Sequence, residues 1–266
     1  MSSVTFTLFS KHRDHSITRC LRVFFLKCET HAESLSHSKK VCNMIKEKTN
    51  PTQTIFFDLD GTLLDTARDF AFSINLLLAR EKKPKLNFDL FRKEVYGESK
   101  RMISFAFGIE EIHPEFEPLR QTFLKTYHQH CTQHTIFFPG MELLLDSLDE
   151  KNIPWGIVTS KPAWLTEPVV NYFGLDKRAI CIIMGDTLSK VKPDPAPLLY
   201  ACECAATLPE NSIYVGDLQT DIVAAKAAGM KSVAVTYGYH PPETDFSNWN
   251  ADWIAQTPED ILIVLT

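Results

Sequence analysis

The 266-residue sequence has no C-x-x-C pair, no long apolar run and no excess of positive charge. Its seven cysteines are odd in number and widely spaced, which argues against a disulfide framework or a zinc ribbon and favours reduced thiols. No apolar run reaches the roughly 18 residues that a bilayer-spanning helix requires. The formal net charge of −5 argues against a general nucleic-acid binder. We therefore expect a globular cytoplasmic protein that has neither a nucleic acid nor a membrane as its partner.

The first fifty residues differ in composition from the rest of the chain. They carry nine Lys or Arg and four Asp or Glu, a net charge of +5, which leaves −10 for the remainder. No period typical of helices or strands is sustained there. We interpret residues 1–53 as an extension outside the fold, either disordered or a misassigned start. A secretory signal, an organelle transit peptide and a true start at Met44 stay open, and we favour the last.

Beyond residue 53, short apolar strands alternate with amphipathic helices. The expected strands are Thr54–Phe57, Trp155–Val158, Ile180–Met184, Ile213–Val215 and Ser232–Val235. The expected helices are Ala67–Arg80, Phe88–Val95, Lys100–Phe107, Pro114–His130, Met141–Lys151, Leu165–Phe173, Pro195–Ala206 and Asp221–Ala228. This alternation indicates βαβ units and predicts an α/β fold, a three-layer Rossmann-like core around a parallel sheet.

A block of helices interrupts the alternation after the first strand. Residues 66–137 contain several expected helices with no convincing strand between them. We predict that they form an inserted α-helical module, called the helical insert below. Residues 54–65 and 138–266 then make up the core.

The first expected strand ends in the segment Asp58-Leu59-Asp60-Gly61-Thr62. Carboxylates two residues apart project to one side of an extended chain, and Gly61 lets the backbone turn sharply after them. A strand followed by an ordinary Asp/Gly turn is the alternative. A chance Asp-x-Asp-Gly-Thr is a roughly 1-in-several-hundred event at average composition, so the segment predicts a functional site.

Polar residues follow the other expected strands in the same way. They are Thr159, Ser160, Lys192, Asp217 and Asp221. The carboxyl ends of parallel strands line the binding crevice of an open sheet. We therefore expect these side chains to converge with Asp58 and Asp60.

Three carboxylates at one point, those of Asp58, Asp217 and Asp221, would repel one another unless a cation lay among them. Oxygen ligands suit Mg²⁺, and zinc is disfavoured because no Cys or His lies near these motifs. Lys192 and the Thr159 hydroxyl would hold an anion beside the metal. This combination indicates phosphoryl transfer through an aspartyl-phosphate.

In order and residue type, these motifs resemble those of the haloacid dehalogenase superfamily of phosphatases, over about residues 54–260. The resemblance implies that Asp58 is the nucleophile. It also implies that Asp60 protonates the leaving oxygen and then deprotonates the water that hydrolyses the intermediate. The helical insert corresponds to the family's cap, which closes over the phosphate site and supplies specificity contacts.

The resemblance also implies the ligands of the site. The transferring phosphoryl group would be bound by Thr159, Ser160 and Lys192. Mg²⁺ would be held by the Asp58 carboxylate, the Asp60 backbone carbonyl and Asp217, with Asp221 in support. Ser160 departs from the pattern, since many members of the family have Asn there, and should alter local hydrogen bonding more than chemistry.

Substrate specificity is expected to come from the helical insert. Lys100 and Arg101 follow the Gly97 turn, and we take them as candidates for contact with an anionic or hydroxylated substrate; a solvated helix end is the alternative. Within the family, the chain is similar to phosphoglycolate phosphatases and to the N-acetylmuramic acid 6-phosphate phosphatases of cell-wall recycling. The latter similarity is carried by Ser99–Met102, Lys192–Pro195, Thr236–Tyr239, Pro241 or Pro242, and Asn248-Trp249 with Ala251-Asp252. The expected substrate is a small phosphorylated metabolite, 2-phosphoglycolate or N-acetylmuramic acid 6-phosphate.

Other interpretations stay open. A sugar phosphomutase shares the core and the Asp-x-Asp pair, whereas a non-enzymatic binding protein is not supported because no motif residue is missing. The chain could be a monomer or a homodimer. Surface or structural roles are expected for His128, His130 and His134. Core or rim packing is expected for Trp164, Tyr237, Tyr239 and His240.

Overall fold

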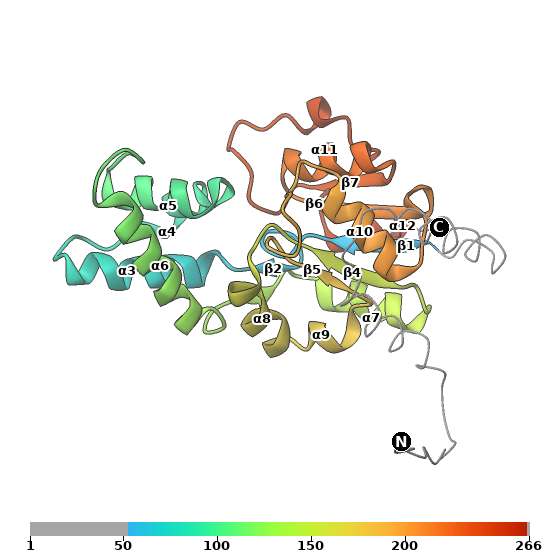
Figure 1. The fold of residues 1–266 in the computed structure, drawn as a ribbon, viewed down its shortest axis with the longest axis horizontal. Coiled ribbons are helices and arrows are strands. Elements are labelled where there is room, and N and C mark those ends of the chain that lie inside the picture. Colours follow the sequence, from blue (N-terminus) through green and yellow to red (C-terminus); the bar gives the residue numbers. More distant parts are fainter. Residues whose placement is uncertain (1–52, 265–266) are drawn as a thin grey trace, which may run out of the picture. The chain divides into compact units, whose positions relative to one another are not determined.

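A computed structural model describes residues 53–264 of the chain (Figure 1). The predicted N-terminal extension, apart from its last residue, and the predicted start at Met44 lie outside the described residues. No helix within the described range is both long and apolar enough to cross a membrane.

Six strands of the described chain form one parallel sheet (Figure 1). They are β1 (Thr54–Phe57), β4 (Trp155–Val158), β5 (Ile182–Ile183), β6 (Ser212–Gly216), β7 (Lys231–Val235) and β8 (Trp253–Ala255). Their spatial order is β5-β4-β1-β6-β7-β8. The chain thus adds β4 and β5 on one side of β1, and then β6, β7 and β8 on the other side. This is the order of Rossmann-type sheets, in which ligands bind where the order reverses. The predicted fold class is confirmed.

Helices cover both faces of the sheet. One face packs against α7 (Met141–Glu150), α8 (Ala163–Tyr172), α9 (Leu175–Arg178) and α12 (Pro258–Ile263), and the other against α10 (Ala196–Ala205) and α11 (Gln219–Ala228). Side chains of β1 alternate between the faces, so Phe57 joins the first apolar cluster and Phe56 the second. Burial on both faces explains why Ile55, Phe56 and Phe57 form an unbroken apolar run rather than alternating with polar residues.

The helices of the insert lie between β2 (Leu64–Asp65) and β3 (Ile136–Phe137), which pair antiparallel with each other. Its helices are α3 (Ala67–Arg80), α4 (Phe88–Arg92), a 3₁₀ turn at Val95–Gly97, α5 (Glu98–Phe107) and α6 (Phe116–His130). Helix α3 packs on α6 through Phe70, whose ring centroid lies 4.4 Å from that of Tyr127. The β2–β3 pair straddles the proposed boundaries of the insert, with β2 on the core side and β3 on the insert side.

Several elements differ from the sequence-based expectation. Ser232–Val235 is not the last strand, because β8 extends the sheet edge and α12 follows it. Trp253 and Ile254 of β8 are exposed, and the three-residue strand is shorter than the apolar run that marks a buried strand. The helix expected at 88–95 ends at Arg92, and the helix expected from Lys100 begins at Glu98. Two further 3₁₀ turns, at Pro209–Asn211 and Phe246–Trp249, occur in the core.

Candidate active site

Three carboxylates meet where β1 and β6 end. Asp58 follows β1, Asp217 follows β6, and Asp221 lies in the first turn of α11. Strands β1 and β6 pair with Phe57 beside Val215, which brings the residues after both strands to the same sheet edge. Each aspartate offers a carboxylate oxygen within 4.8 Å of the other two, and all three residues are buried. The structure therefore brings together the three aspartates that the motifs placed in one cluster.

The loop after β1 approaches Asp217 so closely that it requires a glycine. Gly61 has a φ of +87°, and a Cβ there would lie 2.1 Å from Asp217 Oδ2. The Tyr239 backbone N–H donates to Oδ2 at 2.6 Å, and the Thr62 hydroxyl donates to Oδ1 at 3.3 Å. These contacts hold the Asp217 carboxylate in one orientation toward the cluster.

Lys192 supplies the positive charge of the cluster. Its Nζ lies 2.9 Å from Asp58 Oδ1 and 2.7 Å from Asp221 Oδ1. It also donates to the Tyr214 hydroxyl at 2.8 Å, and that hydroxyl donates to the Val158 carbonyl at 2.6 Å. The ammonium is thus held among groups from four different segments of the core.

Burial and charge together perturb this cluster. Burial raises the pKa of Asp58 to about 6, against the attraction of Lys192 and with added repulsion from Asp221. Burial and repulsion from Asp58 hold the pKa of Asp217 well above its usual range. Burial would lower the pKa of Lys192, but attraction to Asp221 and Asp58 outweighs it and holds this pKa above its usual range. One ammonium does not balance three buried carboxylates, so this all-oxygen set fits a divalent cation such as Mg²⁺.

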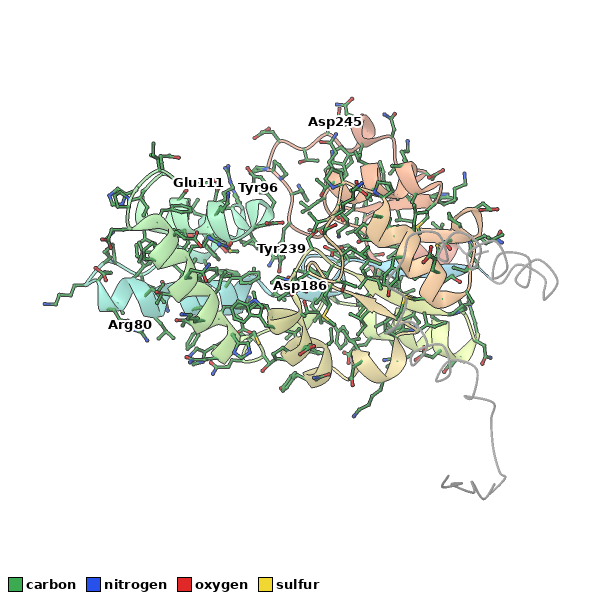
Figure 2. The ribbon with its side chains drawn as sticks, viewed as in Figure 1. Arg80, Tyr96, Glu111, Asp186, Tyr239 and Asp245 are labelled. Atoms are coloured by element: carbon green, nitrogen blue, oxygen red, sulfur yellow. The ribbon has the colours of Figure 1, made fainter. Side chains whose placement is uncertain are left out.

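A cleft of about 460 Å³ opens beside the aspartates. Every core residue predicted for the site lines it, namely Asp58, Asp60, Thr159, Ser160, Lys192, Asp217 and Asp221. Thr159 lies at the cleft because it directly follows β4. Its backbone N–H donates to the Ile183 carbonyl of β5 at 2.9 Å, which continues the pairing of the two strands. The cleft also takes Tyr96 from the insert and Tyr239 from the core (Figure 2).

The insert forms the remaining wall of this cleft. Its lining residues include Val95, Tyr96, Glu98, Ser99, Met102, Arg120, Phe123, Leu124 and Tyr127. Lys100 and Arg101, the predicted specificity candidates, do not line it. Lys100 pairs with Glu111 at 2.6 Å and Arg101 with Glu94 at 2.5 Å, and both lysine and arginine are exposed.

Arg120 is the cation that the insert does bring to the cleft. Its guanidinium donates to the Ser99 hydroxyl at 3.2 Å and to both carboxylate oxygens of Glu117 at 2.7 and 2.8 Å. Sequence reasoning did not single it out. A signal was present, because Arg120 shares a helical stripe with Phe116, Phe123 and Tyr127, and a charged residue on an apolar stripe is unusual.

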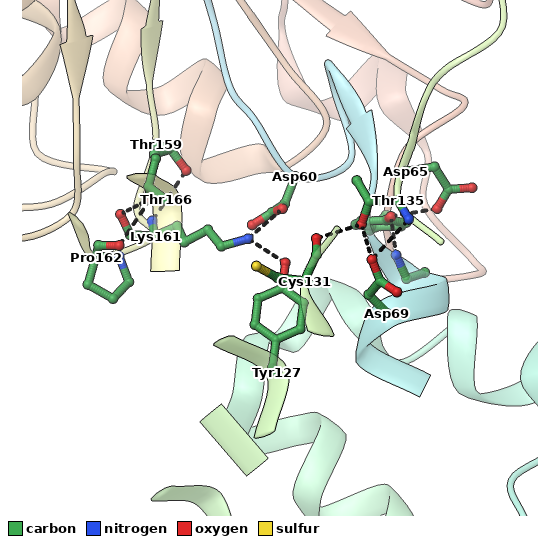
Figure 3. Close-up of polar contacts among 12 residues, drawn as sticks. Asp60, Asp65, Asp69, Tyr127, Cys131, Thr135, Thr159, Lys161, Pro162 and Thr166 are labelled. Atoms are coloured by element: carbon green, nitrogen blue, oxygen red, sulfur yellow. Dashed lines mark hydrogen bonds and ion pairs between the residues drawn. The ribbon is translucent and has the colours of Figure 1, made fainter. Parts of the chain in front are cut away.

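Lys161 is a second residue that sequence reasoning did not assign to the site. It follows Ser160 in the loop after β4, and it lines the cleft. Its Nζ donates to Asp60 Oδ1 at 3.1 Å and to the Tyr127 hydroxyl at 2.7 Å (Figure 3). It is the next residue after Ser160 in the sequence, but nothing local predicted which way its side chain points.

The histidines of the insert make structural contacts. His134 Nδ1 lies 2.8 Å from Asp69 Oδ1, and the His128 ring lies 5.5 Å from that of Trp164. Across residues 53–264, the aspartate cluster is the one group of three or more metal-ligating side chains.

Of the aromatic candidates, Tyr237, Tyr239 and His240 lie in the loop after β7, whereas Trp164 lies on α8. The Tyr237 ring lies 4.8 Å from Phe138, and the His240 ring lies 4.8 Å from Phe246. Two hydroxyls of this group bond to other segments: that of Tyr237 donates to the Thr62 carbonyl at 3.3 Å, and that of Tyr239 donates to Asp65 Oδ1 of β2 at 2.7 Å.

Comparison with known proteins identifies the family. A family model described as haloacid dehalogenase-like hydrolase matches residues 55–235. The chain belongs to this family. The resemblance inferred from the motifs is confirmed, and the chain is therefore a hydrolase.

Two groups of curated relatives are similar to this haloacid dehalogenase-like hydrolase. The N-acetylmuramic acid 6-phosphate phosphatase of Pseudomonas putida is 37% identical over 213 residues, which cover 80% of this chain and 96% of the relative. The phosphoglycolate phosphatase of Xanthomonas campestris pv. campestris (strain 8004) is 36% identical over 209 residues, covering 79% and 94%. Both relatives are phosphatases. Their sequence identities to this chain, 37% and 36%, differ too little to favour the substrate named for one over that named for the other.

Solved structures share the fold. The crystal structure of a predicted phosphoglycolate phosphatase from Haemophilus somnus 129PT superposes with a TM-score of 0.71 at 29% identity, covering 82% of this chain and 100% of that one. A Thermotoga maritima protein assigned as a β-phosphoglucomutase superposes with a TM-score of 0.66 at 23% identity, covering 80% and 98%. At that identity the second likeness concerns the fold alone.

Proposed function

We propose that this hydrolase is a Mg²⁺-dependent phosphomonoesterase that acts through an aspartyl-phosphate on Asp58. The observation that carries the proposal is the convergence of Asp58, Asp217, Asp221 and Lys192 at the point where the strand order of the sheet reverses. Buried carboxylates with one ammonium suit a site that takes both a divalent cation and a phosphoryl group.

In the proposed reaction, the Asp58 carboxylate attacks the phosphorus and Asp60 protonates the leaving oxygen. Asp60 then takes a proton from the water that hydrolyses the aspartyl-phosphate. The transferring phosphoryl group is bound by Thr159, Ser160 and Lys192. Mg²⁺ would be held by the Asp58 carboxylate, the Asp60 backbone carbonyl and Asp217, with Asp221 in support. When bound, the cation offsets the negative charge of the carboxylates and the phosphoryl group.

For the substrate, we favour N-acetylmuramic acid 6-phosphate over 2-phosphoglycolate. The cleft of about 460 Å³ has the size of sites for drug-sized molecules, which is generous for a two-carbon acid. Its insert wall carries Glu98, Ser99 and Arg120, which offer hydrogen bonds to hydroxyl, amide and carboxylate groups.

The proposed partner is thus a small phosphorylated metabolite, and the proposed location is the cytoplasm. The thiols of Cys131, Cys202 and Cys204 suit a reducing compartment, and burial raises the pKa of Cys202 to about 11.

The test is phosphate release from both candidate substrates, with Mg²⁺ and after chelation. We expect Mg²⁺-dependent release that is faster with N-acetylmuramic acid 6-phosphate, and none with Asp58→Asn. Release that survives chelation or the Asp58→Asn substitution would contradict the mechanism. A preference for 2-phosphoglycolate would overturn only the choice of substrate. Interconversion of sugar phosphates without net release would identify a phosphomutase instead.

A further inference from the structure

The side chain of Lys161 is buried beside the proposed acid and base, Asp60. Only 6% of this side chain is exposed. Withdrawing an ammonium from water is costly unless close partners offset the loss of solvation. Its Nζ has such partners in the Asp60 carboxylate, at 3.1 Å, and the Tyr127 hydroxyl, at 2.7 Å. The ammonium also lies over the rings of Tyr127 and Phe70, at 4.7 and 5.5 Å from their centroids.

The core fixes the backbone from which this side chain extends. The Lys161 N–H donates to the Thr159 hydroxyl at 3.2 Å. Its carbonyl accepts from the Gly185 N–H at 2.9 Å and from the Thr166 hydroxyl at 3.0 Å. Gly185 packs so closely that a Cβ there would lie 2.0 Å from the Ser160 carbonyl oxygen. The loop therefore aims Lys161 from one defined position.

The Asp60 carboxylate depends on this contact more than the Asp217 carboxylate does on any one of its contacts. Within residues 53–264, Lys161 is the one side chain that bonds the Asp60 carboxylate. Asp217, by contrast, accepts bonds from both Tyr239 and Thr62. A carboxylate on the edge of a cleft with one partner takes its orientation from that partner. Because Lys161 holds Oδ1, the second oxygen of Asp60 is left for the leaving group.

The helical insert completes the arrangement. Tyr127 lies on α6, and its ring is buried against Phe70 and Phe123. Its hydroxyl is therefore fixed by the packing of the insert, yet it bonds a lysine of the core (Figure 3). Packing of the insert over the cleft and the placement of Lys161 are thus coupled through this hydrogen bond and through the rings of Tyr127 and Phe70 beside the ammonium.

We propose that Lys161 is a positioning residue that orients Asp60 toward the leaving oxygen, and that the Tyr127 hydroxyl of the insert holds Lys161 in place. This inference rests on the proposed role of Asp60 as the general acid. It gives the insert a part in the chemical step, in addition to lining the cleft, because Asp60 is fully oriented only when Tyr127 reaches Lys161.

The test compares p-nitrophenyl phosphate with phenyl phosphate, two esters of similar shape. Phenolate is the poorer leaving group, so its departure needs the proton from Asp60 more. We expect Lys161→Met to lower kcat/KM roughly 10- to 100-fold for phenyl phosphate and less than about threefold for p-nitrophenyl phosphate. Tyr127→Phe, which removes only the hydroxyl, should show the same selectivity to a smaller degree. If Lys161→Met fails to fold, Tyr127→Phe decides alone.

Lys231→Gln is the matched control. Lys231 also pairs with an aspartate, Asp252, at 3.0 Å and lies over an aromatic ring, that of Trp253, but it is exposed and outside the cleft. The Lys231→Gln substitution should leave kcat/KM unchanged for both esters. Equal losses on the two esters, or none, in Lys161→Met and Tyr127→Phe would overturn the positioning role while the wild-type rates still support the phosphatase. A wild-type chain that hydrolyses neither these esters nor either candidate substrate would overturn both.

Discussion

Replacing Asp58 by Asn should stabilise the metal-free protein while abolishing its proposed activity. The substitution keeps the shape of the side chain and an oxygen that accepts the Lys192 hydrogen bond. It removes one of three crowded negative charges, and Lys192 keeps its ion pair with Asp221 at 2.7 Å. The buried ammonium is therefore not left without a countercharge.

The magnitude follows from the perturbed carboxyl. Burial raises the pKa of Asp58 from its usual 3.8 to about 6. That rise corresponds to about 3 kcal/mol of free energy spent in keeping Asp58 ionised in the folded chain. For a folded region of this size, Asp58→Asn should then raise the melting temperature by roughly 6–12 °C at pH 7.5.

The stability difference between Asp58→Asn and the wild type should grow as the pH rises. Well below pH 3.8 the Asp58 carboxyl is protonated in both the folded and the unfolded chain, so its ionisation does not affect stability. As the pH rises from 3.8 to about 6, the unfolded chain ionises first, and the folded wild type loses stability relative to it. Thermal unfolding in a chelator, at several pH values, should show the gap between Asp58→Asn and the wild type opening across this window and staying constant above it.

Two outcomes would refute this reasoning. One is an Asp58→Asn protein that melts below the wild type at pH 7.5, and the other is a gain of equal size at pH 4. Asp245→Asn is the opposite control, because hydrogen bonds from the Ser247 hydroxyl and N–H lower the pKa of Asp245. Removing that charge should not stabilise the protein.

The remaining predictions concern the cation and the packing. Mg²⁺ at about 100 times its dissociation constant should stabilise the wild type by ~2.7 kcal/mol, measured as a rise in melting temperature. The rise should be smaller at pH 5, where protons compete with Mg²⁺ for the carboxylates. No rise at either pH would contradict the metal site. Leu148→Ala leaves a cavity at a fully buried position on α7 and should lower the free energy of unfolding by about 2–5 kcal/mol, measured with denaturant. A loss under about 1 kcal/mol would mean that this position is well solvated. Tyr239→Phe removes the hydroxyl that bonds Asp65 and the Ala67 N–H, and should cost about 1–3 kcal/mol in the same assay; an unchanged unfolding midpoint would show that those bonds are replaced by water.

Much of the fold was predictable because its signals are local. The strand Thr54–Phe57 and the helix Ala67–Arg80 have the predicted bounds. A strand buried on both faces must be apolar throughout, and a helix packed on one face must repeat its apolar residues every three or four positions. The polar residues at the strand ends could be grouped because parallel strands present their carboxyl ends at one edge.

Elements that depend on distant partners were not predictable in this way. Strands β2 and β3 have two residues each and exist because their segments meet at the base of the insert. Strand β8 is an exposed edge strand whose identity depends on pairing with β7. None of these three strands is long enough for its hydrophobic period to distinguish it from a loop.

The same division holds for the site. The sequence by itself determined which residue types stand at the ends of the strands, and hence the carboxylates, hydroxyl and lysine available for phosphoryl chemistry. Only the tertiary structure decided which charges meet. It turned Lys100 and Arg101 to surface partners, brought Arg120 to the cleft, and joined Lys161 to Asp60 across 101 positions of sequence. The physical reason is that residue type and local period are properties of a segment, whereas the direction of a side chain depends on what packs against it.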